Sequence, residues 1–154
     1  MAKPFILVVE DNPDHLELAV ETFRDVGVTV LIEVARDGVE ALDFLFARSA
    51  HAGRCAEQQP AFVMLDIKLP RLSGIDVLRQ MRSNPLTAVV PVIMLTSSTE
   101  RSDVQTCYEA GANSFVHKSF DFALYTKKLQ CLQAYWLGVN EFIAPDSMFA
   151  SLTG

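Results

Sequence analysis

Short apolar runs recur along the chain, separated by segments with a different spacing of apolar positions. Between the runs, apolar residues return three and four positions apart, as in Leu16, Ala19 and Phe23, which is the spacing of one helical face. The pattern predicts strands alternating with helices. The predicted strands cover residues 5–9, 30–35, 61–65, 91–96 and 114–118.

Capping residues mark two of the predicted helix starts. Asn12 precedes Pro13, so a polar cap is followed by a proline at the first helical position, and Ser73 precedes the helical segment 74–82. These signals place Asp11 at the junction between the end of a strand and the start of a helix.

The predicted strands are mostly too uniformly apolar to leave one face in water. Five strand-then-helix units of this kind favour a parallel sheet with helices on both faces, which is a doubly wound α/β fold. Segment 47–60 is polar and interrupted by Gly and Pro, so we expect a loop inside the domain. With 154 residues, half of them apolar, the chain can form one compact domain.

Charge and composition exclude several classes of function. A net charge of −6 gives no basic surface for nucleic acid, and no apolar stretch approaches the roughly 20 residues that a membrane span requires. The three cysteines show no CxxC spacing, and the chain does not start with a signal-peptide pattern. We therefore expect a soluble cytoplasmic protein with reduced thiols.

Polar residues with complementary chemistry follow four of the predicted strands. They are expected to meet in one crevice, because ligands of open α/β sheets bind beyond the carboxyl ends of the strands. Three carboxylates at close range favour a hard cation such as Mg²⁺, while an ammonium and a hydroxyl suit a phosphoryl group. A carboxylate in this setting suits capture of phosphate as an acyl phosphate. The residues are Glu10, Asp11, Asp66, Thr96 and Lys118.

The segments VVEDNPD, MLDIKLPRLSG, PVIMLTSS and ANSFVHK follow one another in an order that resembles a response regulator receiver domain. The resemblance covers almost the whole chain. It implies a flavodoxin-like sheet with strand order 2-1-3-4-5, a receiver domain over residues 1–140 and a C-terminal tail over residues 141–154, with no separate output domain.

The resemblance also implies a role for each residue of the acidic site. Asp66 would accept phosphate from a sensor histidine kinase or from a small acyl phosphate. Glu10, Asp11 and Asp66 would hold Mg²⁺, together with the backbone carbonyl of Lys68. The chain would be a signalling protein that catalyses at most its own phosphorylation and dephosphorylation.

Three further residues complete the resemblance. Thr96 would follow the phosphoryl oxygen, Phe115 would turn inward after it, and Lys118 would bridge to the phosphate. Receivers usually have Pro after this lysine, whereas Ser119 stands here. Because a non-proline cis peptide costs about 2.5–4 kcal/mol, the Lys118–Ser119 bond is expected to be trans or strained.

The last predicted helix, residues 121–138, carries two apolar stripes although a helix on a sheet needs only one. The first stripe is Phe122, Tyr125, Leu129, Leu132 and Trp136. The second is Leu124, Cys131 and Tyr135. We interpret the second stripe, with Trp136, as an interaction surface, while a fold-back of the tail over it stays an alternative.

The ending LQAYWLGVNE resembles small single-domain regulators that include partners of bacterial phytochrome histidine kinases. Members of that group form homodimers through the fourth helix, fifth strand and fifth helix, so a homodimer and a phytochrome kinase partner are implied.

One alternative function stays open, and a further one is disfavoured. The chain could be a constitutive dimeric scaffold with a receiver fold that is never phosphorylated. An enzyme acting on a metabolite is disfavoured, because no further general acid or base accompanies the site. His15, His51 and His117 have no metal-ligand spacing and are expected to be satisfied or exposed.

Overall fold

A computed structural model describes residues 4–24, 30–97 and 100–143. Five parallel strands form one sheet in the order β2-β1-β3-β4-β5, which confirms the predicted fold class and strand order. The strands are β1 (Phe5–Val9), β2 (Leu31–Ala35), β3 (Val63–Asp66), β4 (Val92–Thr96) and β5 (Ser114–His117).

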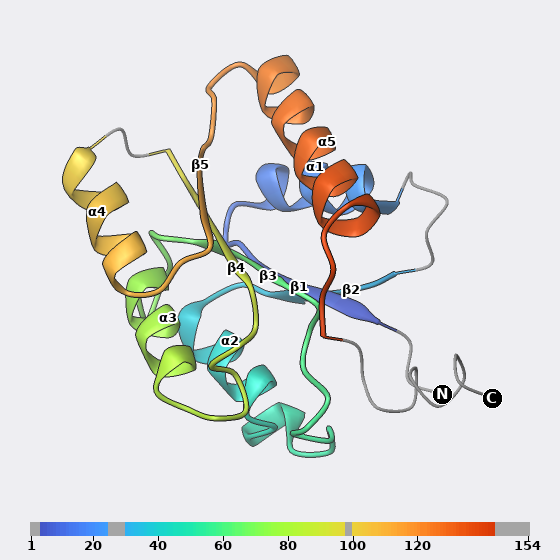
Figure 1. The fold of residues 1–154 in the computed structure, drawn as a ribbon, viewed down its shortest axis with the longest axis vertical. Helices are drawn as coiled ribbons and strands as arrows, with labels where there is room; N and C mark the ends of the chain where they lie inside the picture. Colours follow the sequence, from blue (N-terminus) through green and yellow to red (C-terminus); the bar gives the residue numbers. More distant parts are fainter. Residues whose placement is uncertain (1–3, 25–29, 98–99, 144–154) are drawn as a thin grey trace.

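Helices cover both faces of the sheet (Figure 1). One layer contains α1 (Pro13–Arg24) and α5 (Phe122–Gly138), which pack against each other. The opposite layer contains α2 (Gly38–Leu45), α3 (Gly74–Arg82) and α4 (Arg101–Glu109). The predicted loop 47–60 is irregular except for the short 3-10 helix η1 (Ser49–His51).

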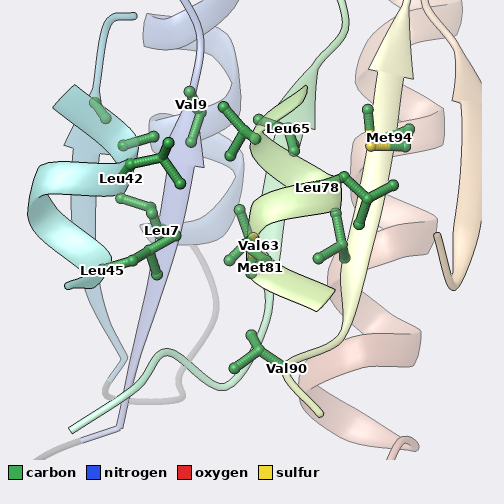
Figure 2. Close-up of a cluster of buried hydrophobic side chains, with 14 of the residues drawn as sticks. Leu7, Val9, Leu42, Leu45, Val63, Leu65, Leu78, Met81, Val90 and Met94 are labelled. Atoms are coloured by element: carbon green, nitrogen blue, oxygen red, sulfur yellow. The ribbon is translucent and has the colours of Figure 1, made fainter. Parts of the chain in front are cut away.

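The two helical layers explain why the central strands are continuously apolar. Leu7 and Val9 of β1 point into the core beneath α2 and α3, whereas Ile6 and Val8 point into the core beneath α1 and α5. Figure 2 shows the first of these cores, where Leu7 and Val9 lie among side chains from β3, β4 and the two helices. Neither face of these strands meets water.

The predicted helix starts agree with the capping contacts. The Asn12 side-chain oxygen accepts hydrogen bonds from the backbone N–H groups of Asp14 (2.9 Å) and His15 (3.3 Å), which fixes the first turn of α1. The Ser73 hydroxyl accepts from the backbone of Asp76 at 3.2 Å at the start of α3. Asp121 caps α5 in the same way.

The helix α5 corrects two expectations drawn from its stripes. We expect Phe122 on the same buried stripe as Tyr125 and Leu129, but it is 54% exposed at the first position of α5, where its ring lies near His15. We expect Trp136 at an exposed interface, but it is only 8% exposed and packs on the ring of Phe62, 5.7 Å away between centroids. Trp136 is therefore a core residue of the monomer.

Within residues 4–24, 30–97 and 100–143, none of the helices combines the length and the hydropathy of a membrane span. Residues 144–154, which form most of the predicted tail, lie outside the described residues.

Candidate functional site

The carboxyl ends of four strands bring charged and polar side chains together at one end of the sheet. Glu10 follows β1, Asp66 ends β3, Thr96 ends β4 and Lys118 follows β5. All four are buried, with at most 8% of their surface exposed. Because parallel strands all end on the same side, residues more than a hundred positions apart in sequence become neighbours here.

Three carboxylates form an acidic cluster. One oxygen from each of Glu10, Asp11 and Asp66 lies within 4.8 Å of the others. Glu10 and Asp66 are buried, whereas Asp11 is exposed and faces solvent. An all-oxygen donor set with one open side fits Mg²⁺, which binds through a few carboxylates and keeps several waters.

Lys118 supplies the positive charge that balances this cluster. Its Nζ donates to Glu10 Oε1 and, at 2.9 Å, to Asp66 Oδ2. Its backbone N–H donates to the Thr96 carbonyl at 2.7 Å, so β4 fixes the position at which the side chain leaves β5. The bond between Lys118 and Ser119 is trans, since the described residues contain no cis peptide.

The surroundings of Glu10 favour its protonated form. Burial and the nearby Asp66 carboxylate raise the pKa of Glu10 to about 7, against the opposing effect of the Lys118 ammonium. Backbone N–H groups of Asp11 (3.1 Å) and Asn12 (3.4 Å) donate to its other oxygen, Oε2. In the absence of a metal ion, burial thus holds the pKa of Glu10 well above its ordinary value of 4.5.

Close packing of α3 against β3 holds the Asp66 backbone. The Gly74 N–H donates to the Ile67 carbonyl at 2.8 Å, and a Cβ at Gly74 would collide with the carbonyl oxygen of Asp66. The Ser73 cap starts α3 at this position. Lys68 lies two residues beyond Asp66 with an exposed side chain, and the ligand role of its carbonyl stays a prediction.

Thr96 and Phe115, the two expected switch residues, lie on neighbouring strands. Thr96 is fully buried at the end of β4, and Phe115 of β5 is half-buried against the core beneath α3. Phe115 pairs with Met94 in the sheet register. Their places agree with the expected order along the chain, while their switching roles stay predictions.

Sequence reasoning missed one residue that the fold brings to the site. His15, in the first turn of α1, places Nδ1 3.3 Å from Lys118 Nζ. Its ring lies against Phe122 and Tyr125 of α5, with centroid distances of 6.1 and 5.7 Å. The only signal in the sequence is its position four residues after Asp11, one helical turn along a helix that begins at the site.

A groove opens beside α5, away from the acidic cluster. It has a volume of about 820 Å³ and runs between β5 and the outer stripe of α5. Leu124 is 47% exposed and Tyr135 is 50% exposed on its wall, and Cys131 is exposed between them. The structure thus brings the second stripe to the surface, as the sequence predicted.

The strand order and the acidic end of the sheet define a flavodoxin-like α/β protein of the receiver type. The family model for the response regulator receiver domain matches residues 6–130, so the chain belongs to the response regulator receiver family. Proteins of this family serve two-component signalling.

The chain is similar to two regulatory proteins over most of its length. It is 36% identical over 143 residues to the probable methanogenesis regulatory protein FilR2 of Methanothrix harundinacea, covering 92% of this chain and 90% of FilR2. It is 30% identical to response regulator Rcp1 of Synechocystis over 86% of this chain and 88% of Rcp1.

Solved structures show the same fold. The crystal structure of Mn²⁺-bound Rcp1 superposes with a TM-score of 0.87, covering 92% of this chain and 99% of that chain at 28% identity. The phosphorylated cyanobacterial phytochrome response regulator RcpA superposes with the same TM-score of 0.87, covering 93% of this chain and 100% of that chain at 26% identity. Phytochrome response regulators are therefore among the structural neighbours of this chain.

Proposed function

We propose that this chain receives a phosphoryl group on Asp66 in a Mg²⁺-dependent reaction, with a sensor histidine kinase as the physiological donor. One observation carries the proposal: Lys118 contacts both Asp66 and Glu10, and Asp11 completes an acidic cluster with them at the end of the sheet. The Lys118 ammonium and the buried carboxylates provide the charge pattern that phosphoryl transfer requires.

The reaction is a displacement at phosphorus. A carboxylate oxygen of Asp66 attacks the phosphorus atom, and the bond from phosphorus to the donor breaks as the new bond forms. The donor leaves with the electron pair, as acetate from acetyl phosphate or as a neutral imidazole from a phosphohistidine. Lys118 lies close enough to Asp66, at 2.9 Å, to neutralise the oxygens of the incoming group.

The metal would be held by Glu10, Asp11, Asp66 and the carbonyl of Lys68. When bound, Mg²⁺ neutralises negative charge on the carboxylates and on the phosphoryl oxygens. The Mn²⁺-bound crystal form of Rcp1 supports a divalent cation in a receiver of this shape. The exposed Asp11 leaves the cluster open to solvent on one side, which gives a cation a route in.

The signal would leave through Thr96 and Phe115. Phosphorylation adds about 1.5–2 negative charges and three acceptor oxygens at Asp66. The Thr96 hydroxyl follows the new oxygens, and the half-buried Phe115 changes its packing beside β4, which alters the surface formed by α4, β5 and α5.

Acetyl phosphate provides the direct test. Incubation of the protein with acetyl phosphate and Mg²⁺ is expected to add the mass of one phosphoryl group, and Asp66→Asn abolishes the gain. Asp14→Asn is the matched control. Asp14 is an exposed carboxylate in the first turn of α1 and does not belong to the acidic cluster. Mg²⁺ binding without any mass gain would instead support the constitutive scaffold.

A phytochrome kinase is the proposed input. RcpA, which shares the fold over nearly its whole length, is a phytochrome response regulator. The test is phosphotransfer from an autophosphorylated bacterial phytochrome kinase, which should label the parent protein within minutes and leave Asp66→Asn unlabelled. A non-cognate kinase serves as the control for specificity.

The groove beside α5 is the proposed dimer interface. Leu124, Cys131 and Tyr135 expose an apolar stripe next to β5, the unpaired edge of the sheet on that side. In a two-fold symmetric dimer, the exposed stripe of each copy would be covered by the other copy. Trp136 also lines the groove, but it is only 8% exposed and packs on Phe62 in the monomer core, so it offers little surface to a partner.

A further inference from the structure

The Lys118 ammonium lies next to two carboxylates and one imidazole, that of His15. An ammonium has three protons to donate. Two go to the carboxylates of Glu10 and Asp66, and the third contact is His15 Nδ1 at 3.3 Å. Lys118 is only 4% exposed, so its ammonium is largely shielded from bulk solvent.

The contact defines which nitrogen of His15 carries the proton. An ammonium has no lone pair, so it can only donate, and His15 Nδ1 must accept. The ring proton is then on Nε2. For the same reason the 3.6 Å approach of Nδ1 to Glu10 Oε1 is not an ion pair, since an unprotonated Nδ1 carries no charge.

His15 is held where this contact needs it. Its backbone N–H donates to the Asn12 side chain, so the first turn of α1 is fixed. On the other side, the ring packs against Phe122 and Tyr125 of α5. The ring therefore has little freedom to turn away from Lys118.

His15 also differs from Glu10 and Asp66 in its expected role during cation binding and phosphoryl transfer. Glu10 and Asp66 are the candidate metal ligands, and Asp66 is the proposed phosphoryl acceptor, so their oxygens are drawn into other interactions. His15 belongs to neither set. It is the one neutral acceptor of the three that stays available to Lys118.

We propose that His15 is a positioning residue that holds the Lys118 ammonium at the acceptor carboxylate while Glu10 and Asp66 engage the cation and the phosphoryl group. This inference rests on the proposed phosphoryl transfer to Asp66. His15 acts through Lys118 and has no contact with the reacting atoms. Its loss should reduce the rate of transfer without removing the site.

The first test reads the contact itself, without metal or phosphate. Ring nitrogen shifts of ¹⁵N-histidine protein in EDTA, at a pH where the ring is neutral, should show His15 as the Nε2–H tautomer. Lys118→Met should shift His15 toward a mixture of tautomers and leave the shifts of His51, which packs on Phe44 elsewhere in the fold, unchanged. A parent His15 with Nδ1 protonated, or no change in Lys118→Met, would overturn the proposal.

The second test reads the rate of phosphorylation by acetyl phosphate at saturating Mg²⁺. His15→Leu should lower the rate constant roughly tenfold, the size expected for loss of a supporting hydrogen bond around a site. His15→Asn should restore most of it, because Asn Oδ1 offers an acceptor near the place of Nδ1. His51→Leu is the matched control and should match the parent.

A double-mutant cycle separates positioning from a general structural effect. In the Lys118→Met background, adding His15→Leu should change the residual rate by less than about twofold, because the residue it positions is gone. The same tenfold loss in both backgrounds, or failure of His15→Asn to rescue, would overturn the proposal. If the parent itself gains no phosphoryl group, the proposed function fails, and the tautomer experiment still decides the contact.

Discussion

At the scale of single residues, the site is a balance between one buried ammonium and two buried carboxylates. Lys118 contacts both Glu10 and Asp66, and each of the three is nearly inaccessible to solvent. Removing one partner of a buried ion pair leaves an uncompensated charge, which costs far more than a surface pair gains. The site therefore has measurable consequences for stability before any ligand binds.

Replacing the lysine should expose this balance. Lys118→Met is expected to lower the free energy of unfolding in EDTA by about 3 kcal/mol, because Glu10 and Asp66 are left facing each other without a cation. Mg²⁺ should restore more stability to the variant than to the parent, since the metal takes over the neutralising role. Urea titrations with EDTA and with Mg²⁺ measure both effects.

Lys127→Met controls for the loss of a lysine, because Lys127 is exposed on α5 and should change stability little. Equal losses in the two variants, or equal gains from Mg²⁺ in Lys118→Met and the parent, would contradict the role assigned to Lys118.

The raised pKa of Glu10 predicts a definite pH dependence of apo stability. The folded state holds a proton up to about pH 7, whereas the unfolded carboxyl releases it near its ordinary pKa of 4.5. Between these values the unfolded state binds fewer protons, so the free energy of unfolding falls as pH rises, and the fall stops above about pH 7. Glu10→Gln should remove this part of the slope.

Urea unfolding in EDTA at several pH values from about 5 to about 8 checks the sign. The parent should lose stability relative to Glu10→Gln as pH rises across this window. A difference between the two proteins that is constant with pH, or that grows in favour of the parent, would show that Glu10 is not protonated in the folded state.

The sequence predicted the acidic and basic residues of the site because each follows an apolar strand directly. A strand end is a local feature, and parallel strands bring their ends together without further information. The contact between His15 and Lys118 could not be predicted in this way. It depends on how α1 and α5 pack against each other, which brings His15 beside Phe122 and Tyr125.

At the scale of elements, tight helix–strand contacts decide where the site residues stand. Arg82 at the end of α3 donates to the carbonyls of Gly111 (2.9 Å) and Val90 (2.8 Å) and to the side chain of Asn113 (2.9 Å), linking α3 to the segments before β4 and β5. Nothing in the local sequence predicts these partners, since they are backbone and side-chain groups of loops, and Gly111 and Asn113 lie about thirty residues further along the chain.

The Gly74 contact gives a prediction at this scale. Gly74→Ala places a methyl group against the Asp66 carbonyl, so α3 must move away from β3. We expect a loss of about 2 kcal/mol in the free energy of unfolding, typical of overpacking, and slower phosphorylation because the Asp66 backbone shifts. Gly53→Ala is the matched control, because an added Cβ there meets nothing within 4 Å.

Thermal or urea unfolding of the two glycine variants measures the change in stability. The rate of labelling by acetyl phosphate measures the change in phosphorylation. Gly74→Ala with the stability of Gly53→Ala would mean that α3 accommodates the methyl group without strain. The contact would then not be what holds Asp66.

At the scale of the complete fold, one side of α5 packs in the core and the other side lies at the surface. Tyr125, Leu129 and Trp136 fill the core beneath α1, whereas Leu124 and Tyr135 remain on the surface. The two apolar stripes were visible in the sequence. The burial of Trp136 agrees with its place on the first stripe, and only its additional assignment to the interface is wrong, because its ring packs on Phe62, just before β3.

This division predicts opposite outcomes for neighbouring residues. Tyr135→Ser and Leu124→Ser should shift sedimentation from dimer toward monomer with little change in the unfolding of the monomer, because both side chains are about half exposed. Trp136→Ala should instead destabilise the fold by about 3–5 kcal/mol, as expected when a large core side chain is removed.

Val89→Ser is the control, because Val89 is 67% exposed in the segment between α3 and β4, away from the groove. Sedimentation velocity at several protein concentrations separates the outcomes. A parent that is already monomeric, or dimers that persist in both Tyr135→Ser and Leu124→Ser, would remove the groove as the dimer interface. The stripe would then have to be explained by another partner. The proposal for the acidic site would still stand, because the hydrogen-bond partners of the Lys118 ammonium, Glu10, Asp66 and His15, do not line the groove.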